Sequence, residues 1–270
     1  MPIEIATLLP AVALAARRAG AAILHHYEGD FAVDRKADGS PVTAADHASE
    51  AVMLEALKTL TPHIPVVSEE QVEAGKFPDV SAGRFWLVDP LDGTKEFVKR
   101  NGEFAVVVGL VVDFKPVAGV IYAPVLDVLY AGGAAGAWQE KDGRSEPLSA
   151  RAAAADGLVV AISRSHIGPK FESYLATLPL KGRLPCGSAI KFGLLAAGEA
   201  DIYPRFGPTM EWDTAAGHAI LEAAGGRVET KDGQPLVYGK PGFLNDGFIA
   251  RGRASYSPVG NIDDIRCQEE

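Results

Sequence analysis

Apolar residues recur every three or four positions over residues 3–28, so they line one face of a predicted helix. The repeating positions are Leu8, Val12, Ala15, Ala19 and Ile23. Gly29 then marks its end, because glycine is typical of helix C-termini. A second helix is predicted to start after Thr43 and to end at Thr61-Pro62, because proline interrupts a helix.

Short runs of β-branched and apolar residues, bounded by Gly, Pro or Asp, predict strands in the middle of the chain. These runs cover residues 66–67, 85–88, 105–112 and 117–122, followed by glycine-rich hairpin material at 129–139. The second half predicts strand 158–162, helices 169–178 and 188–197, strand 200–206, helix 213–224 and closing strands. Together they indicate a layered α/β or α+β fold.

A polar, alanine-rich stretch at residues 145–156 separates the two halves of this pattern. The sequence contains neither an internal repeat nor a low-complexity tail. We therefore predict a single domain over residues 1–270, with this stretch as a seam rather than a flexible linker.

The formal charge of −9 argues against a nucleic-acid polymer as the partner, since a polyanion requires clustered cations. A phosphate substrate would need local cations. Cys186 and Cys267, the two cysteines, have no metal-ligand spacing, which favours a reducing cytoplasm. The apolar stretch 5–16 lacks a basic leader and is too short to span a bilayer, so we expect neither a signal peptide nor a transmembrane segment.

The most informative segment is Asp89-Pro90-Leu91-Asp92-Gly93-Thr94, which directly follows a predicted strand. Pro90 fixes its own φ and Gly93 relaxes the turn, so the two carboxylates and the Leu91 carbonyl could converge. Such hard oxygen ligands suit Mg²⁺. For an isolated Asp-x-x-Asp-Gly, however, an acidic turn is the commoner outcome.

Two further acidic elements are Ser68-Glu69-Glu70, after a strand, and Trp212-Asp213, at the start of a helix. Taken alone, the first would be a solvated loop and Asp213 a helix N-cap. Their combination with the Asp-Gly turn carries the functional interpretation.

The order and spacing of four motifs resemble the inositol monophosphatase superfamily over nearly the whole chain. The motifs are Lys36-x-Asp38-x-Ser40-Pro41-Val42-Thr43-x-x-Asp46, Ser68-Glu69-Glu70, Asp89 to Thr94, and Trp212-Asp213-x-Ala215-Ala216-Gly217. The resemblance implies the superfamily fold of alternating αβαβα layers and an Mg²⁺-dependent phosphatase.

Within the superfamily, three runs resemble the 3′(2′),5′-bisphosphate nucleotidases, namely Val88 to Phe97, Arg100-Asn101-Gly102-Glu103-Phe104 and Tyr203-Pro204-Arg205-Phe206-Gly207-Pro208. Inositol phosphatases usually have Thr-Asn-Phe after the Asp-Gly-Thr and an acidic residue where Arg205 stands. Arginine binds phosphate, whereas a carboxylate accepts hydrogen bonds from inositol hydroxyls. The implied reaction converts adenosine 3′,5′-bisphosphate to AMP and phosphate in sulfate assimilation. Whether the sulfated analogue is a second substrate stays open.

The resemblance also implies roles for single residues. Glu69, Asp89 and the Leu91 carbonyl would hold one Mg²⁺, and Asp89, Asp92 and Asp213 a second, with two or three ions per site. Asp46 and Thr94 would take the proton from the attacking water. From the residues alone, Asp46 would be an exposed helical residue and Thr94 a turn hydroxyl.

The implied substrate contacts combine several metal ligands with candidates from the second half. They are Glu69, Leu91, Asp92, Gly93, Thr94, Ser163, His166, Ser188, Lys191, Arg205 and Asp213. Ser188 as an N-cap, Lys191 as a solvated lysine and His166 as a loop residue are equally weighted alternatives.

Two alternatives to a nucleotidase remain. An inositol or sugar monophosphatase is disfavoured by Arg205 and by the run after Thr94. An inactive metal- or nucleotide-binding protein should lack a ligand or the water-activating pair, and the sequence keeps them all. We expect a small nucleotide as partner, a cytoplasmic location and a monomer or homodimer. The resemblance also implies sensitivity to lithium, whose degree stays open, as does peripheral contact with the inner membrane.

Overall fold

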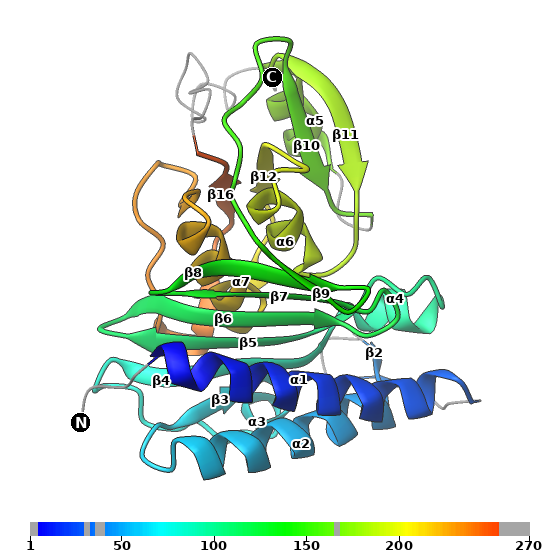
Figure 1. Ribbon diagram of the computed structural model, residues 1–270, viewed down its shortest axis with the longest axis vertical. Coiled ribbons are helices and arrows are strands. Elements are labelled where there is room, and N and C mark those ends of the chain that lie inside the picture. The colour runs from blue at the N-terminus through cyan, green and yellow to red at the C-terminus, as the bar shows by residue number, and fades with distance from the viewer. Residues whose placement is uncertain (1–4, 30–32, 36–40, 165–167, 254–270) are drawn as a thin grey trace, which may run out of the picture.

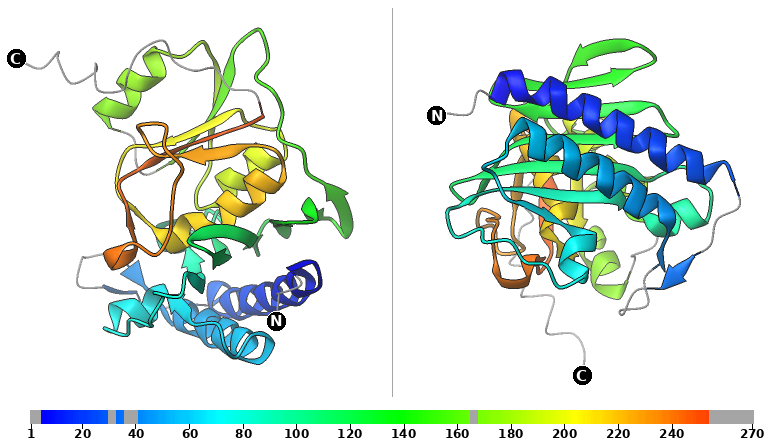
Figure 2. Two further views of the ribbon diagram at one scale, coloured as in Figure 1. Left: turned by 90° about the vertical axis from the view of Figure 1, so that its left-hand side faces the viewer. Right: turned by 90° about the horizontal axis from the view of Figure 1, so that it is seen from below.

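Two β-sheets alternate with three helical layers in the computed structural model, which describes residues 5–29, 33–35, 41–164 and 168–253. The pair α1 (Ile5–Tyr27) and α2 (Ala44–Leu60) covers the outer face of a seven-stranded sheet. The helices α6 (Ile190–Ala196) and α7 (Glu211–Ala223) lie between the two sheets, and α5 (Pro169–Ala176) covers the far face (Figures 1 and 2). This arrangement confirms the predicted layered α/β fold.

The seven-stranded sheet is antiparallel except for its first pair, β3 and β4, which is parallel. Its order is β3 (Val66–Ser68), β4 (Arg84–Asp92), β5 (Ala105–Val112), β6 (Lys115–Ala123), β7 (Val128–Gly133), β8 (Gly136–Lys141) and β9 (Arg144–Pro147). Alternate residues face opposite cores. On β5, Val106 and Val108 face α1 and α2, whereas Val107 and Val111 face α6 and α7.

The second sheet mixes parallel and antiparallel pairs. Its order is β11 (Leu180–Pro185), β10 (Leu158–Ile162), β12 (Ile202–Arg205), β16 (Phe248–Arg251) and β14 (Arg227–Glu229). Two small pairs join β1 (Asp34–Arg35) to β2 (Pro41–Val42), and β13 (Thr209–Met210) to β15 (Leu244–Asn245). The remaining helices are α3 (Glu69–Glu73), α4 (Thr94–Val98) and the 3-10 turn η1 (Pro241–Phe243).

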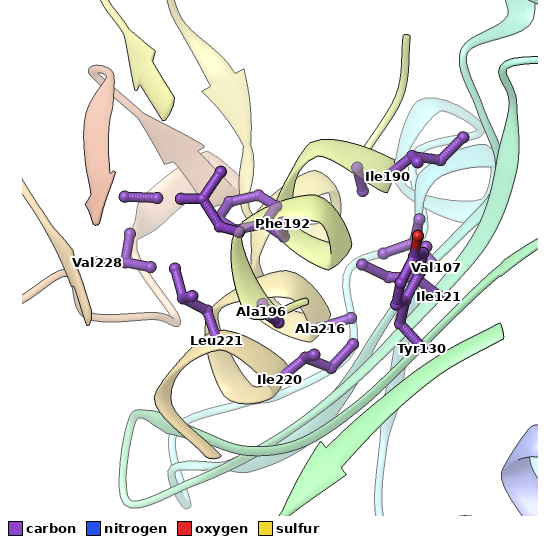
Figure 3. Close-up of a cluster of buried hydrophobic side chains, with 14 of the residues drawn as sticks. Val107, Ile121, Tyr130, Ile190, Phe192, Ala196, Ala216, Ile220, Leu221 and Val228 are labelled. Carbon is purple, nitrogen blue, oxygen red and sulfur yellow. The ribbon is translucent and has the colours of Figure 1, made fainter. Parts of the chain in front are cut away.

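Side chains from both sheets and from α6 and α7 form the central core shown in Figure 3. Glycines let α7 approach the first sheet very closely. A Cβ added to Gly119 on β6 would lie 2.3 Å from the carbonyl oxygen of Ala216, and one added to Gly109 on β5 would lie 2.8 Å from its nitrogen. The helix therefore lies directly on strand backbone, which fixes the position of its first turn.

The helix α1 is longer than the apolar stretch 5–16 on which the sequence argument rested. By length and composition, Thr7–Tyr27 could cross a membrane, with a mean hydropathy of 1.4. However, Val12, Ala16 and Ile23 are fully buried in the core beneath the first sheet. We therefore interpret α1 as a core helix of the fold.

The predicted seam at 145–156 begins in the edge strand β9 and carries the chain from the first sheet to the second (Figure 2). Within it, the Ala150 amide donates to the carbonyl of Ala224, and Arg151 makes two hydrogen bonds to the carboxylate of Asp201, of 2.8 and 2.9 Å. These contacts tie the seam to both layers beside it. The organisation of residues 1–270 as one domain stays a prediction.

Candidate active site

The Asp-Gly turn at the end of β4 forms the centre of the site. The pairing of β4 with β5 shifts register between Asp89 and Asp92, and an Asp89 oxygen accepts the Leu91 amide at 2.9 Å. The Ser49 hydroxyl of α2 donates to the Pro90 carbonyl at 2.6 Å, which anchors the turn. Gly93 then takes a φ of 95°, a left-handed conformation, and leads into α4.

Asp46 and Thr94, the proposed catalytic pair, are brought together by α2 and α4. The Thr94 hydroxyl lies 3.5 Å from Asp46 Oδ1 and 3.3 Å from the Leu91 carbonyl. Asp46 Oδ2 accepts from the amide and hydroxyl of Thr43, both at 2.8 Å, so Asp46 also caps its helix. Asp46 is only 2% exposed, and the alternative of a solvated helical residue is therefore wrong.

Asp92 and Asp213 are two carboxylates that line the same pocket. Asp92 Oδ2 accepts the Ser188 hydroxyl at 2.7 Å and the Ala189 amide at close range. Asp213 Oδ2 accepts the Thr209 hydroxyl at 2.5 Å and the Met210 amide at 3.0 Å. Asp213 is the third residue of α7, so it caps the helix without being its N-cap.

Burial, together with the negative charge of Asp92, raises the pKa of Asp213 to about 6 against the opposing hydrogen bonds from Thr209 and Met210. Two carboxylates that repel each other across a pocket are the donor set that a divalent cation compensates. The residues present therefore fit Mg²⁺.

The pocket that these elements enclose has a volume of about 190 Å³. Nine of the predicted site residues line it, namely Glu69, Asp92, Gly93, Thr94, Ser163, Ser188, Lys191, Arg205 and Asp213. Asp46, Asp89 and Leu91 do not line it, and all three are buried. His166 lies outside the described residues. The sequence reasoning did not predict Lys95, Glu96, Tyr203, Thr209 or Thr214, which also line the pocket.

Glu69 begins α3, and its carboxylate forms a close group with those of Glu70 and Glu73, whose oxygens lie within 4.8 Å of one another. Glu70 belonged to the Ser-Glu-Glu motif, but sequence reasoning gave it no ligand role. Its signal was its place in an acidic pair directly after a buried strand. The grouping of Glu69 with Asp89, Asp92 and Asp213 as ligands stays a prediction.

The positions of Ser188 and Lys191 exclude the alternative roles of helix N-cap and solvated lysine. Ser188 is not the N-cap, because α6 begins at Ile190 and is preceded by Ala189. Lys191 is not solvated, since it is 3% exposed. Its ammonium donates to the carbonyls of Cys186, at 3.1 Å, and Ser188, at 2.5 Å, and lies 5.0 Å from the centre of the Tyr203 ring.

A second cavity, of about 660 Å³, adjoins the first and shares Ser163, Tyr203 and Arg205 with it. Phe171 and Phe206 contribute aromatic surface to its wall. Arg205 donates from Nη2 to the Pro208 carbonyl at 3.2 Å, while its buried Nε has no hydrogen-bond partner among the described residues. Arg205 thus places a cation in the lining of both cavities.

Comparisons with known proteins agree with this geometry. The model of the inositol monophosphatase family matches residues 5–255. The 3′(2′),5′-bisphosphate nucleotidase CysQ of Escherichia coli (strain K12) is 47% identical over 244 residues, which cover 89% of this chain and 98% of that protein. Its counterpart from Salmonella typhimurium is 49% identical with the same coverage.

Among solved structures, CysQ from Bacteroides thetaiotaomicron, described as a bacterial member of the inositol monophosphatase family, superposes with a TM-score of 0.75. It is 40% identical, and the match covers 90% of this chain and 97% of that chain.

Proposed function

The chain belongs to the inositol monophosphatase family, and we infer from this premise that it is a 3′(2′),5′-bisphosphate nucleotidase. It hydrolyses the 3′-phosphate of adenosine 3′,5′-bisphosphate to AMP and phosphate, a reaction of sulfate assimilation. The observation that carries this assignment is Arg205, whose side chain lines both the acidic pocket and the larger cavity. A substrate with two phosphates needs a cation at that junction.

In this proposal, two sets of oxygens hold Mg²⁺, one from Glu69, Asp89 and the Leu91 carbonyl, and one from Asp89, Asp92 and Asp213. The number of ions, two or three, is part of the proposal. Bound Mg²⁺ supplies positive charge that neutralises the phosphate and lowers the pKa of water. The raised pKa of Asp213 supports a cation beside Asp92, because that ion would relieve the repulsion between them.

Asp46 and Thr94 accept the proton that the attacking water loses. The Thr94 hydroxyl passes it to Asp46 Oδ1, since Oδ2 already accepts two hydrogen bonds from Thr43. The separation of 3.5 Å is long for a hydrogen bond, as is common in catalytic pairs without substrate. The Leu91 carbonyl, 3.3 Å from the hydroxyl, helps to orient it.

The nucleoside and the second phosphate occupy the junction and the second cavity. Arg205 binds the second phosphate, while Ser163, Ser188 and Lys191 provide polar groups from the lining of the acidic pocket. Phe171 and Phe206 offer apolar surface that suits a base. His166 is retained as a proposed contact. We further propose a cytoplasmic enzyme that acts as a monomer or homodimer.

The test is a phosphate-release assay that compares adenosine 3′,5′-bisphosphate with inositol 1-phosphate, each with Mg²⁺ and with EDTA. We expect kcat/KM for the bisphosphate to exceed that for inositol 1-phosphate by at least about tenfold, and EDTA to abolish both activities. A preference for inositol 1-phosphate would reject the nucleotidase assignment within the family. Full activity in EDTA would reject the metal proposal.

A further inference from the structure

Glu103, in the loop between α4 and β5, joins the catalytic half of the molecule to two loops of the second sheet. Its carboxylate forms two hydrogen bonds with the Arg164 guanidinium, Nε to Oε2 at 2.6 Å and Nη2 to Oε1 at 2.7 Å. Oε2 also accepts the Gly187 amide at 2.8 Å. Arg164 follows β10 and Gly187 follows β11, so one carboxylate connects the ends of two neighbouring parallel strands.

The backbone of Glu103 is also in very close contact with both sides of the site. A Cβ added to Gly187 would lie 2.6 Å from the Glu103 carbonyl oxygen, and one added to Gly93 would lie 3.2 Å from the same atom. The Glu103 amide donates to Asn101 Oδ1 at 2.9 Å, which fixes the loop. Glu103 is thus held between the Asp-Gly turn and the loop that precedes α6.

The two loops that Glu103 holds each carry a serine that lines the pocket. Ser163 directly precedes Arg164, and Ser188 directly follows Gly187. Ser188 has a φ of 57°, an uncommon conformation for a residue with a side chain, so its neighbours must hold it there. Glu103 does so through the Gly187 amide on one side, and Asp92 does so through the Ala189 amide on the other.

The charge of Glu103 is well supported at this position. Hydrogen bonds from Arg164 hold the pKa of Glu103 below its usual range against the effect of burial, and the Gly187 amide and the charge of Lys191 add to this. The Glu103 side chain is 17% exposed. Its partner Arg164 is 44% exposed, so solvent screens the pair on the arginine side and the Gly187 amide adds a contact on the buried side.

We propose that Glu103, together with Arg164, is a positioning residue for nucleoside recognition, because it sets where the Ser163 and Ser188 hydroxyls lie in the pocket lining. The inference rests on the proposed function. Glu103 contributes mainly to binding of the nucleotide, since the described hydrogen bonds of Asp46 and Thr94 do not involve the two loops and only Asp92, through Ser188 and Ala189, connects one loop to the proposed metal ligands. Substrates without a nucleoside should therefore be much less sensitive to its charge.

The experiment measures kcat and KM of Glu103→Gln and Arg164→Lys for adenosine 3′,5′-bisphosphate and for p-nitrophenyl phosphate, which has no nucleoside. We expect Glu103→Gln to raise KM for the bisphosphate about tenfold and to lower kcat/KM for p-nitrophenyl phosphate by a much smaller factor. Arg164→Lys should have a smaller effect in the same direction, because lysine keeps the charge but not the paired geometry.

Glu172→Gln is the matched control, because Glu172 and Arg183 form a similar bidentate pair, at 2.9 and 2.7 Å, on exposed parts of α5 and β11. Glu172→Gln should leave kcat and KM unchanged for both substrates.

The inference would be overturned if Glu103→Gln lowered kcat/KM equally for both substrates, or if Glu103→Gln and Arg164→Lys behaved like this control. If the wild type lacks a preference for the bisphosphate, the proposed function fails; if it has one that Glu103→Gln keeps, only the role of Glu103 fails. Should Glu103→Gln not fold, Arg164→Lys decides alone.

Discussion

At the scale of single residues, the functional groups are held in place by protein hydrogen bonds before any ligand arrives. Asp46, Asp92 and Asp213 each accept at least two hydrogen bonds, from backbone amides and from Thr or Ser hydroxyls. These hydrogen bonds orient the carboxylates, and they hold Asp92 and Asp213 close enough for their negative charges to repel each other. That repulsion gives the site a measurable dependence on pH.

Asp213 should destabilise the metal-free protein above neutral pH. Its pKa is about 6 in the folded chain against an ordinary value of 3.8, so the folded state binds this proton more tightly. The resulting stabilisation is complete below 3.8 and is lost as the pH rises through 6. In EDTA, Asp213→Asn should match the wild type near about pH 4 and be more stable by roughly 1–3 kcal/mol near about pH 7.5. Urea unfolding at both pH values tests this, and an equal difference at both would contradict it.

Thr94→Ala should lower kcat by ~10²–10⁴, because it removes the hydroxyl that passes a proton to Asp46. Mg²⁺ affinity measured by calorimetry should change little, since the proposed ligands are retained. Thr94→Ser keeps the hydroxyl and serves as the control. Loss of Mg²⁺ binding with an intact single-turnover rate would reverse the assigned role.

Arg205→Glu should raise KM for adenosine 3′,5′-bisphosphate by at least about tenfold, because a charge-assisted hydrogen bond is replaced by repulsion. A monophosphate without a second anion should be affected much less. The decisive quantity is the ratio of kcat/KM for the two substrates. If both fall by the same factor, Arg205 has a structural role only.

At the scale of elements, the sequence pattern predicted the long helices and the buried strands, because their periodicity extends over many residues. It ended the strand 85–88 four residues early, since the bulge after Asp89 lets β4 continue to Asp92. The edge strand β11, with Gly182 and alternating exposed residues, lacks an apolar run and was missed. The helices α3 and α4 have five residues each, too few to show a helical period.

The site was predicted as a set of motifs, whereas its supporting contacts were not. Sequence motifs gave Asp92 and Ser188 separate roles, but their hydrogen bond joins residues that lie far apart in the chain. The same holds for Glu103, which lies in the run Arg100 to Phe104 that resembles the nucleotidases but received no role there, because its partners follow two later strands. Long-range contacts of this kind leave no local pattern from which they could be predicted.

The glycines beneath α7 should be essential to its position. In Gly119→Ala the new methyl would meet the Ala216 backbone, which cannot rotate away, so the helix or the strand must shift. We expect the free energy of unfolding to fall by about 1–3 kcal/mol, with a further loss of activity because α7 carries Asp213. Gly182→Ala on β11 is the control, since a Cβ there meets nothing within 4 Å. Equal stability of the two variants in urea would contradict the argument.

At the scale of the whole molecule, residues from both sheets line the active site. The seam at residues 145–156 must therefore hold the two sheets in their relative position. Asp201 is 5% exposed and accepts two hydrogen bonds from Arg151 and one from the Val159 amide. A buried carboxylate of this kind depends on its cation. The seam is therefore expected to be a structural joint of the enzyme.

Arg151→Ala should lower the free energy of unfolding by about 1–3 kcal/mol, because it removes the cation beside the buried Asp201 carboxylate, while the 39% exposure of the Arg151 side chain lets solvent screen part of the effect. Replacing both residues, with Asp201→Asn added, should recover part of this loss. Limited proteolysis would then show cleavage within residues 145–156 earlier in the single variant than in the wild type. Cleavage of both at the same rate would mean that the seam is held by its backbone contacts alone.

The hydrogen bonds of Asp92 have a thermodynamic consequence. One of its oxygens holds Ser188 and Ala189, in the loop proposed to contact the nucleotide, while the same carboxylate is a proposed ligand of the cation. Binding of the nucleotide to this loop therefore alters the free energy of Mg²⁺ binding, and Mg²⁺ binding alters that of the nucleotide. Such linkage is reciprocal: the factor by which bound Mg²⁺ changes the affinity for the nucleotide equals the factor by which the bound nucleotide changes the affinity for Mg²⁺.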